Sequence, residues 1–302
     1  MAHSPQRGSP EVWLADPTRC CSNTGAGNAQ WPGSGSVVRA PYYLTHRLPV
    51  RTAGAERRPV AMRMRCLPTA LLAMVLASRA SAAFDHLLFD KVLGKYVSNG
   101  RVNYHGLLSD ADFPKYLETL ATANASALGG RADQLAFWIN AYNASCLNGV
   151  LKRYPIASVQ KDRSFFKSQE HKVAGATRSL GDIENGILRA KYKDARVHFA
   201  LNCASASCPA LSDSAYTGSK LSSQLDAAAK RFLNDPSRNK FSVTAKEAQL
   251  SSLFKWYAKD FGSQSQMLST LAKYVPAPVA AMLKSGTVKV SYLGYDWSMN
   301  GR

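Results

Sequence analysis

The chain has 302 residues, of which 46% are apolar, and a formal net charge of +18 at neutral pH. This apolar content is sufficient for a hydrophobic core, so a wholly disordered chain and a small fold that depends on disulfides are both excluded. The charge alone would allow binding to nucleic acid, to anionic lipid or to an anionic polymer.

Residues 1–61 differ in composition from the rest of the chain. They contain seven arginines and no lysine, whereas residues 83–302 contain 18 lysines and 10 arginines. They are rich in Gly, Pro and Ser and show no sustained apolar period, so they cannot bury enough surface to fold. We interpret them as a disordered N-terminal extension or as the product of a mis-assigned start codon, and the second is favoured by the segment that follows.

Residues 62–82 have the layout of a secretory signal peptide. A short basic stretch, Met62–Arg65, precedes a mostly apolar run over 66–77, and small residues occupy positions 80 and 82. This order predicts cleavage after Ala82 and a periplasmic or secreted protein. The alternative is a membrane anchor, but the apolar run is shorter than the roughly 20 residues that span a bilayer. No other run approaches that length, so no transmembrane segment is expected after signal cleavage.

The predicted mature chain, residues 83–302, would then be a single basic domain. It contains 28 Lys and Arg against 17 Asp and Glu, a net charge of +11. The lysines are scattered and no nucleic-acid-binding signature is present, so nucleic acid is not an expected partner and the charge is interpreted as solvated surface charge.

The first predicted helices of this domain lie at 84–96, 110–124 and 133–153, with a short strand at 101–105 between the first two. The third helix has a broad apolar stripe with Asn140 and Asn143 beside it. Asparagine is a poor residue for a helix interior, so a half-buried amide there needs partners. These two side chains either line a binding site or tie loops to the helix.

Two β-like fragments are predicted next, near 165–166 and at 171–173, followed by a helix over 183–191. Glu184 lies in the first turn of this helix, where the helix dipole stabilises a carboxylate. It could serve as a cap, orient a neighbouring histidine, or act as a base.

Residues 197–209 contain the most reactive side chains of the predicted domain. The run Val197–Asn202 is typical of a buried strand, with His198 and Asn202 on one face and Cys203 on the other. Histidine titrates near neutral pH and an ionised thiol is a strong nucleophile. However, Cys203 and Cys208 enclose a four-residue loop, and in an oxidising compartment a disulfide between them is expected. One histidine with this cysteine pair is a weak metal signature, so no metal is expected.

The last predicted elements are a helix over 221–232, a hairpin at 241–250, a helix over 253–261, one or two helices within 266–284, and a strand at 288–292. Helices and strands alternate without a regular βαβ period. The sequence therefore predicts an α+β fold, with one modest, mainly antiparallel sheet and helices packed on it.

Five ordered motifs resemble the domain of unknown function 547 family: FWINAYNA (137–144), SLGDIENGILR (179–189), VHFALNCASASCP (197–209), LFKWY (253–257) and YDWSMN (295–300). The resemblance implies a bacterial envelope protein of unestablished activity, and such domains are similar, by analogy only, to papain- or transglutaminase-like thiol enzymes. The family often has histidine where this chain has Asn185. If that histidine is the base in relatives, this member is either inactive or dependent on His198.

Two functions remain open at this point. The first is a thiol hydrolase or transferase with Cys203 as nucleophile, His198 as base and Glu184 orienting the imidazole, supported by Asn140, Asn143 and Asn202 as substrate-binding amides. The second is a non-catalytic envelope domain that binds a peptide or glycan, with a Cys203–Cys208 disulfide. Neither function involves a cofactor.

Overall fold

A computed structural model describes residues 83–302, which belong to one compact unit. The extension predicted at 1–61 and the signal peptide predicted at 62–82 lie outside the described residues. Within 83–302, the longest apolar helices fall short of what a membrane crossing would require.

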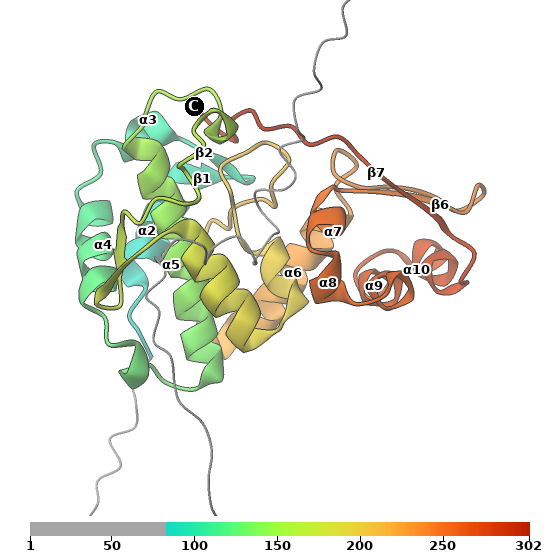
Figure 1. The fold of residues 1–302 in the computed structure, drawn as a ribbon, viewed down its shortest axis with the longest axis horizontal. Coiled ribbons are helices and arrows are strands. Elements are labelled where there is room, and N and C mark those ends of the chain that lie inside the picture. Colours follow the sequence, from blue (N-terminus) through green and yellow to red (C-terminus); the bar gives the residue numbers. More distant parts are fainter. Residues whose placement is uncertain (1–82) are drawn as a thin grey trace, which may run out of the picture. The chain divides into compact units, whose positions relative to one another are not determined.

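The first part of the unit is mainly helical (Figure 1). Its elements are α2 (Leu87–Tyr96), β1 (Val97–Ser98), β2 (Arg101–Val102), α3 (Tyr104–Leu107), α4 (Asp112–Thr122), the 3-10 turn η2 (Ala125–Ala127), α5 (Arg131–Leu151), η3 (Val159–Lys161), β3 (His171–Val173) and β4 (Ala176–Arg178). The predicted helices at 84–96, 110–124 and 133–153 are confirmed with small shifts of their ends.

Helix α5 is the centre of this part. It contacts α3, α4 and α6 as well as two irregular helices, η4 (Asp182–Tyr192) and η6 (Gly218–Lys220). At its start the Asp133 carboxylate accepts a hydrogen bond from the backbone N–H of Gly130 at 2.9 Å, which fixes the first turn. Almost every side chain from Leu135 to Val150 is buried. Because all its faces are covered, a polar side chain on α5 must find its partner inside the protein.

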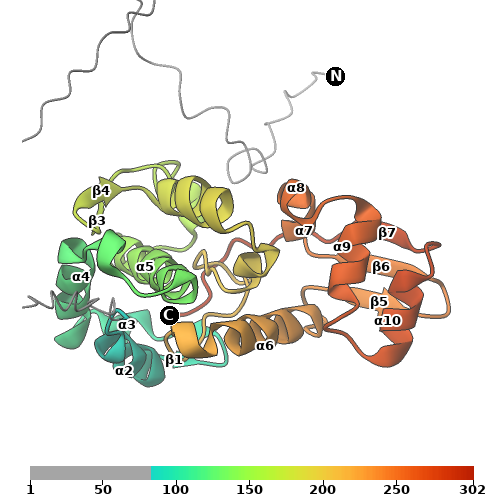
Figure 2. The same ribbon diagram turned by 90° about the horizontal axis from the view of Figure 1, so that it is seen from below.

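The second part begins with two helices of unusual type, the π-helix η4 (Asp182–Tyr192) and the 3-10 helix η5 (Ala195–Phe199). The remaining elements are η6 (Gly218–Lys220), α6 (Leu221–Leu233), β5 (Lys240–Ser242), β6 (Glu247–Leu250), α7 (Leu253–Trp256), α8 (Ala258–Phe261), α9 (Gln264–Leu271), α10 (Ala277–Lys284) and β7 (Lys289–Tyr292). Figure 2 shows α6 leading from the α5 region toward the group formed by α7–α10 and β5–β7.

The predicted strand at 197–202 is wrong, because this segment forms η5 and then an irregular loop. The Asp194 side chain accepts a hydrogen bond from the backbone N–H of Arg196 at 3.0 Å, and this local cap starts a helical turn. The strand predicted at 101–105 is shorter than expected and ends at Val102. The Asn103 side chain accepts a hydrogen bond from the backbone N–H of Gly106, and this cap begins helix α3 in place of a longer strand. Phe165 and Phe166 lie in turns and not in a strand.

The strands form three small sheets. β1–β2 and β3–β4 are antiparallel pairs, and the third sheet has the order β5-β6-β7. In it β5 pairs antiparallel to β6, while β6 pairs parallel to β7. The predicted α+β class with mainly antiparallel pairing is therefore confirmed, although the strands are divided among three sheets where one was expected.

Two apolar cores lie within the unit. One is built around α2–α5 and η4, and the other around the end of α6, α7–α10 and the third sheet. Trp297, near the C-terminus, packs against both cores. The candidate site lies where these two cores meet.

Candidate functional site

The loop at 203–208 is closed by a disulfide between Cys203 and Cys208, whose Cα atoms are 6.0 Å apart. The predicted disulfide is therefore present. The backbone N–H of Cys203 also lies 2.8 Å from Sγ of Cys208, and both residues are buried. In this state Cys203 has no thiolate to offer as a nucleophile.

The C-terminal segment 295–300 holds this loop from outside. Ala206 N–H donates to the carbonyl of Ser298 at 2.7 Å, and Asn300 N–H donates to the carbonyl of Ala204 at 3.1 Å. The guanidinium of Arg238 donates to the carbonyls of Ala206 and Cys208, both at 2.9 Å. These contacts provide partners for four backbone groups of the loop and tie it to the C-terminal segment and to Arg238.

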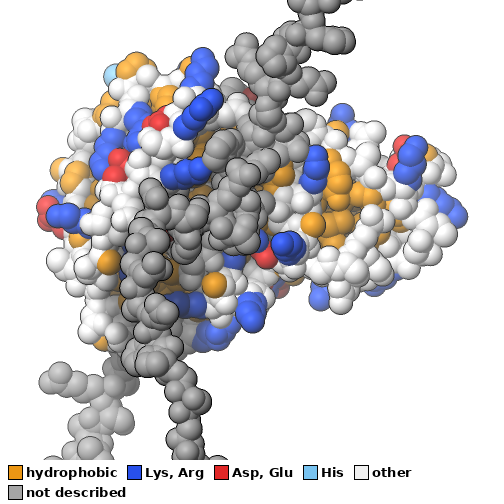
Figure 3. Space-filling model, in the orientation of Figure 1, with side chains coloured by type: hydrophobic (Ala, Val, Ile, Leu, Met, Phe, Trp, Pro, Cys, Tyr) orange, Lys and Arg blue, Asp and Glu red, His pale blue; other side chains and the backbone are white. Residues whose placement is uncertain are grey.

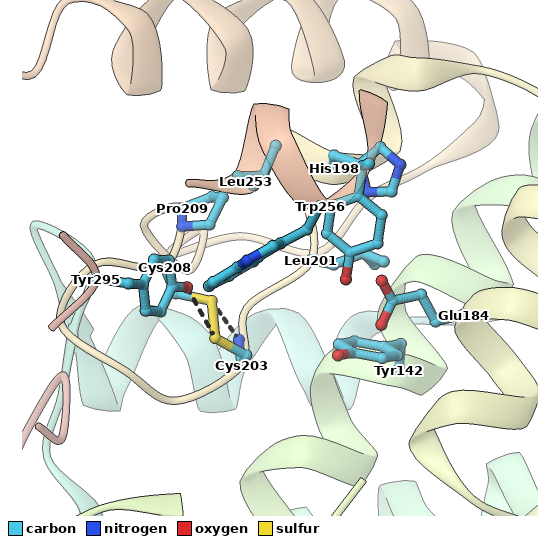
Figure 4. A pocket seen from close by; sticks show the side chains of 11 residues that line it. Tyr142, Glu184, His198, Leu201, Cys203, Cys208, Pro209, Leu253, Trp256 and Tyr295 are labelled. Atoms are coloured by element: carbon cyan, nitrogen blue, oxygen red, sulfur yellow. Dashed lines mark hydrogen bonds between the residues drawn. A yellow bond between two sulfur atoms is a disulfide. The ribbon is translucent and has the colours of Figure 1, made fainter. Parts of the chain in front are cut away.

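Beside the disulfide lies a narrow pocket with a volume of about 30 Å³. The predicted residues Cys203, His198 and Glu184 all lie on its wall, as Figure 4 shows. Its full lining is Tyr142, Glu184, His198, Leu201, Cys203, Cys208, Pro209, Leu253, Trp256, Tyr257 and Tyr295. A pocket of this size admits about one or two water molecules, or the tip of a ligand.

Glu184 supplies the acidic group of the pocket. It projects from η4 and is 5% exposed. The phenols of Tyr142 and Tyr257 have pKa values well above the ordinary value, because burial, the negative charge of Glu184 and a hydrogen bond to it all favour the neutral phenol. Both phenols therefore act as donors to this carboxylate, and its remaining lone pairs are the acceptors that the pocket offers.

His198 has a different partner from the predicted one. Its Nε2 lies 2.7 Å from Oδ2 of Asp260 on α8, and its ring stacks on Tyr257 at a centroid distance of 4.0 Å. Arg189 binds the same carboxylate through Nε and Nη2. No hydrogen bond joins His198 to Cys203 or Glu184 among residues 83–302. The pocket thus brings the three predicted catalytic residues together without linking them.

Two of the predicted amides tie loops to α5. Asn140 donates to the carbonyl of Tyr216 at 2.8 Å and accepts from its N–H at 2.9 Å. Asn143 donates to the carbonyl of Ala200 at 3.0 Å and accepts from the N–H of Asn202 at 2.9 Å. Their amides are occupied by the backbone, and neither lines the pocket.

The third predicted amide, Asn202, shapes the cysteine loop from within. It donates to the carbonyl of Pro209 at 2.8 Å and accepts from the N–H of Ala204 at 2.9 Å and from the Asn300 side chain at 3.1 Å. It is 2% exposed and does not line the pocket. The geometry gives all three asparagines a positioning role, and the substrate contact predicted for them stays a prediction.

Residues 126–233 match the sequence model of the family described as "Protein of unknown function, DUF547". This segment of the chain is therefore similar to the DUF547 family. The match covers the motifs at 137–144, 179–189 and 197–209, while those at 253–257 and 295–300 lie outside the matched range. No curated protein and no solved structure matches this chain.

Several residues that line this pocket were not predicted as site residues. Tyr257 and Trp256 belong to the LFKWY motif and Tyr295 to the YDWSMN motif, so the resemblance marked their segments but not their role. Trp256 has its indole Nε1 buried without a hydrogen-bond partner within residues 83–302. In the view of Figure 4 its ring separates the disulfide from Glu184. The sequence around Asp260 did not indicate a role at the site, since a single aspartate in a short helix resembles any surface carboxylate.

Asn185, which replaces the family's frequent histidine, accepts a hydrogen bond from Nη1 of Arg189. It therefore supports the guanidinium that binds Asp260 and does not line the pocket. No group of three His, Cys, Asp or Glu side chains in the described part of the chain could hold a metal ion.

Proposed function

We propose that this protein is an exported, non-catalytic domain that binds a glycan, with the pocket beside the disulfide as its binding site. The observation that carries the proposal is the Cys203–Cys208 disulfide on the pocket wall. It removes the nucleophile of the thiol-enzyme alternative. The groups that remain are hydrogen-bonding and aromatic, which suits binding.

The polar groups of the pocket fit a hydroxyl group. Glu184 offers acceptor lone pairs, and Nε1 of Trp256 is a buried donor without a partner in residues 83–302. A hydroxyl both donates and accepts, so one hydroxyl of a sugar would satisfy the carboxylate and the indole together. A ligand carbonyl would satisfy only the indole, and an ammonium only the carboxylate.

An aromatic surface adjoins the pocket and suits the rest of a sugar ring. Trp256 and Trp297 stack with their centroids 5.8 Å apart, and Tyr295 lies 4.7 Å from each of them. Partly exposed indole and phenol rings offer apolar faces with polar edges, which match the alternating C–H and O–H groups of a saccharide. The pocket would hold one hydroxyl while the rings hold the sugar body.

The thiol-enzyme alternative is retained as a second candidate for one reason. Cys203, His198 and Glu184 line the same pocket although they lie on different elements. Reduction of the disulfide would free a thiol there. The binding function is favoured because the imidazole hydrogen is directed to Asp260 and the loop is held closed by its neighbours.

Export is part of the proposal and is supported by the sequence of residues 62–82 together with the disulfide. Disulfides persist in oxidising compartments and are rare in the cytosol. A periplasmic or secreted location would also place the domain among envelope glycans and peptides.

The proposal is tested by titrating the protein with soluble neutral oligosaccharides and with short peptides while intrinsic tryptophan fluorescence is recorded. At least one oligosaccharide should bind saturably. Trp256→Phe keeps an aromatic ring but removes the N–H donor, and should weaken binding about fivefold to tenfold. Glu118→Gln, on the exposed face of α4, is the matched control and should bind like the wild type. Binding of peptides alone, or of neither class, would overturn the proposal.

A further inference from the structure

A second and larger cavity lies on the other side of the His198–Asp260 contact. Its volume is about 270 Å³, enough for a small ligand group with its first waters. It is lined by the end of η4, the start of η5 and α8, through Arg189, Lys193, Asp194, Ala195, Val197, Lys259 and Asp260. The first pocket shares none of these residues.

Both carboxylates on the wall of this cavity are already neutralised. Asp260 is bound by two guanidinium nitrogens of Arg189 and by His198. Asp194 is bound by the guanidinium of Arg196, whose Nη2 lies 2.8 Å from Oδ2. A carboxylate held by a guanidinium in this way has little remaining attraction for a cation.

The two lysines that line the cavity, unlike its carboxylates, have no partner of opposite charge within residues 83–302. Lys193 and Lys259 are exposed, and neither forms an ion pair with any residue in 83–302. The cavity therefore presents two uncompensated ammonium groups beside carboxylates that are already occupied. Ammonium groups bind phosphate and carboxylate oxygens well and have three donors each to direct at them.

The backbone at Lys193 supports a specific role for that side chain. Lys193 follows the last residue of η4 with φ of 52°, in the left-handed region. Helices commonly end in this conformation with glycine, because a Cβ makes it costly. Lys193 adopts this left-handed conformation although it has a Cβ, and its side chain lines the cavity.

We propose that this cavity is a binding site for an oxyanion, a phosphate or carboxylate group, held by Lys193 and Lys259. The site is independent of the proposed glycan pocket, since it needs neither Glu184 nor Trp256. The same chemistry would be met by a free anion or by an anionic group on a polymer.

The test is a titration of the ¹⁵N-labelled full chain with inorganic phosphate at constant low ionic strength, followed by NMR. The amide signals of Lys193, Asp194 and Lys259 should shift saturably. The double variant Lys193→Gln/Lys259→Gln should weaken phosphate binding about tenfold or more. The control is Lys91→Gln/Lys172→Gln, which removes two exposed lysines from α2 and β3, away from the cavity, and should leave binding unchanged.

A second arm uses a short polyphosphate in place of inorganic phosphate. Tighter binding of polyphosphate at the same amides would assign the site to a group carried on a polymer, and equal or weaker binding would assign it to a free anion. The proposal is overturned if no saturable shift occurs at these amides with either probe, or if the control variant loses as much affinity as the double variant. Loss of glycan binding in Trp256→Phe would leave this result unaffected.

Discussion

The imidazole of His198 donates from Nε2 to the carboxylate of Asp260 across 2.7 Å. Burial alone would raise the pKa of Asp260, but the hydrogen bonds from His198 and Arg189 outweigh it and lower that pKa strongly. The carboxylate stays ionised and can only accept, which fixes the hydrogen of His198 on Nε2. The contact joins η5 to α8, and Arg189 adds η4, so one carboxylate connects three elements around the site.

The first prediction concerns this carboxylate. Asp260→Asn should lower the free energy of unfolding at neutral pH by about 1–2 kcal/mol, because His198 and Arg189 lose a charged acceptor. A depressed pKa stabilises the fold above the ordinary Asp pKa of about 4, and this stabilisation is lost as the pH falls below that value. Urea denaturation between pH 7 and pH 3 should therefore show a shallower decline for the variant. Identical pH profiles for the wild type and Asp260→Asn would refute this assignment.

The second prediction concerns Asn143. Asn143→Ala removes both hydrogen bonds that fix residues 200–202 and leaves a buried carbonyl and a buried N–H unpaired, at a cost of about 2–4 kcal/mol. Asn148→Ala, on the same helix and half-buried, should change stability by less than about 0.5 kcal/mol. Thermal denaturation of the two variants measures the difference. A similar melting temperature for both would mean that the amide does not hold the loop.

The helices of this fold could be predicted because their apolar positions recur at helical spacing. Leu135, Trp138, Ile139 and Tyr142 mark α5 in the sequence as they do in the structure. The conformation of segment 197–202 could not be predicted, because a short apolar run fits a buried strand as well as it fits a buried helical turn. What decides its conformation is the Asp194 cap together with the distant Asn143.

The site was predictable only in part for a similar reason. Cys203, His198 and Glu184 carry chemistry that draws attention in a sequence, and they do meet at one pocket. Their partners come from far along the chain. Asp260 has no distinguishing local pattern, and the YDWSMN motif marks the segment of Tyr295 but not its role at the pocket. The three asparagines were recognised as needing partners, but nothing local could say that backbone groups supply them.

The third prediction concerns the disulfide as a stabilising link. Cys203→Ser should lower the free energy of unfolding by about 1–3 kcal/mol in the loop-entropy account, since the closed loop is short. Reductant should destabilise the wild type by a similar amount and leave Cys203→Ser unchanged. Denaturant titrations with and without reductant make this comparison. A variant as stable as the oxidised wild type would show that the link is not structural.

The fourth prediction concerns export. The basic start, the apolar run and the small residues of 62–82 should direct secretion with cleavage after Ala82. N-terminal sequencing of the exported protein should begin at Ala83 or within a few residues of it. A mature protein that begins at Met1 would contradict both the signal peptide and the exported location.

The proposed binding function depends most directly on whether the sulfur atoms of Cys203 and Cys208 are joined in a disulfide. Peptide mass mapping of the purified, unreduced protein measures this oxidation state. The account predicts a fragment containing Cys203 and Cys208 that is lighter than its reduced form by two hydrogen atoms and does not react with an alkylating agent. The same result is expected in His198→Ala, because within residues 83–302 His198 forms its hydrogen bond with Asp260 and none with the sulfur. A reduced Cys203 that alkylates rapidly at neutral pH, and more slowly in His198→Ala, would contradict the account and establish the thiol–imidazole pair of an enzyme.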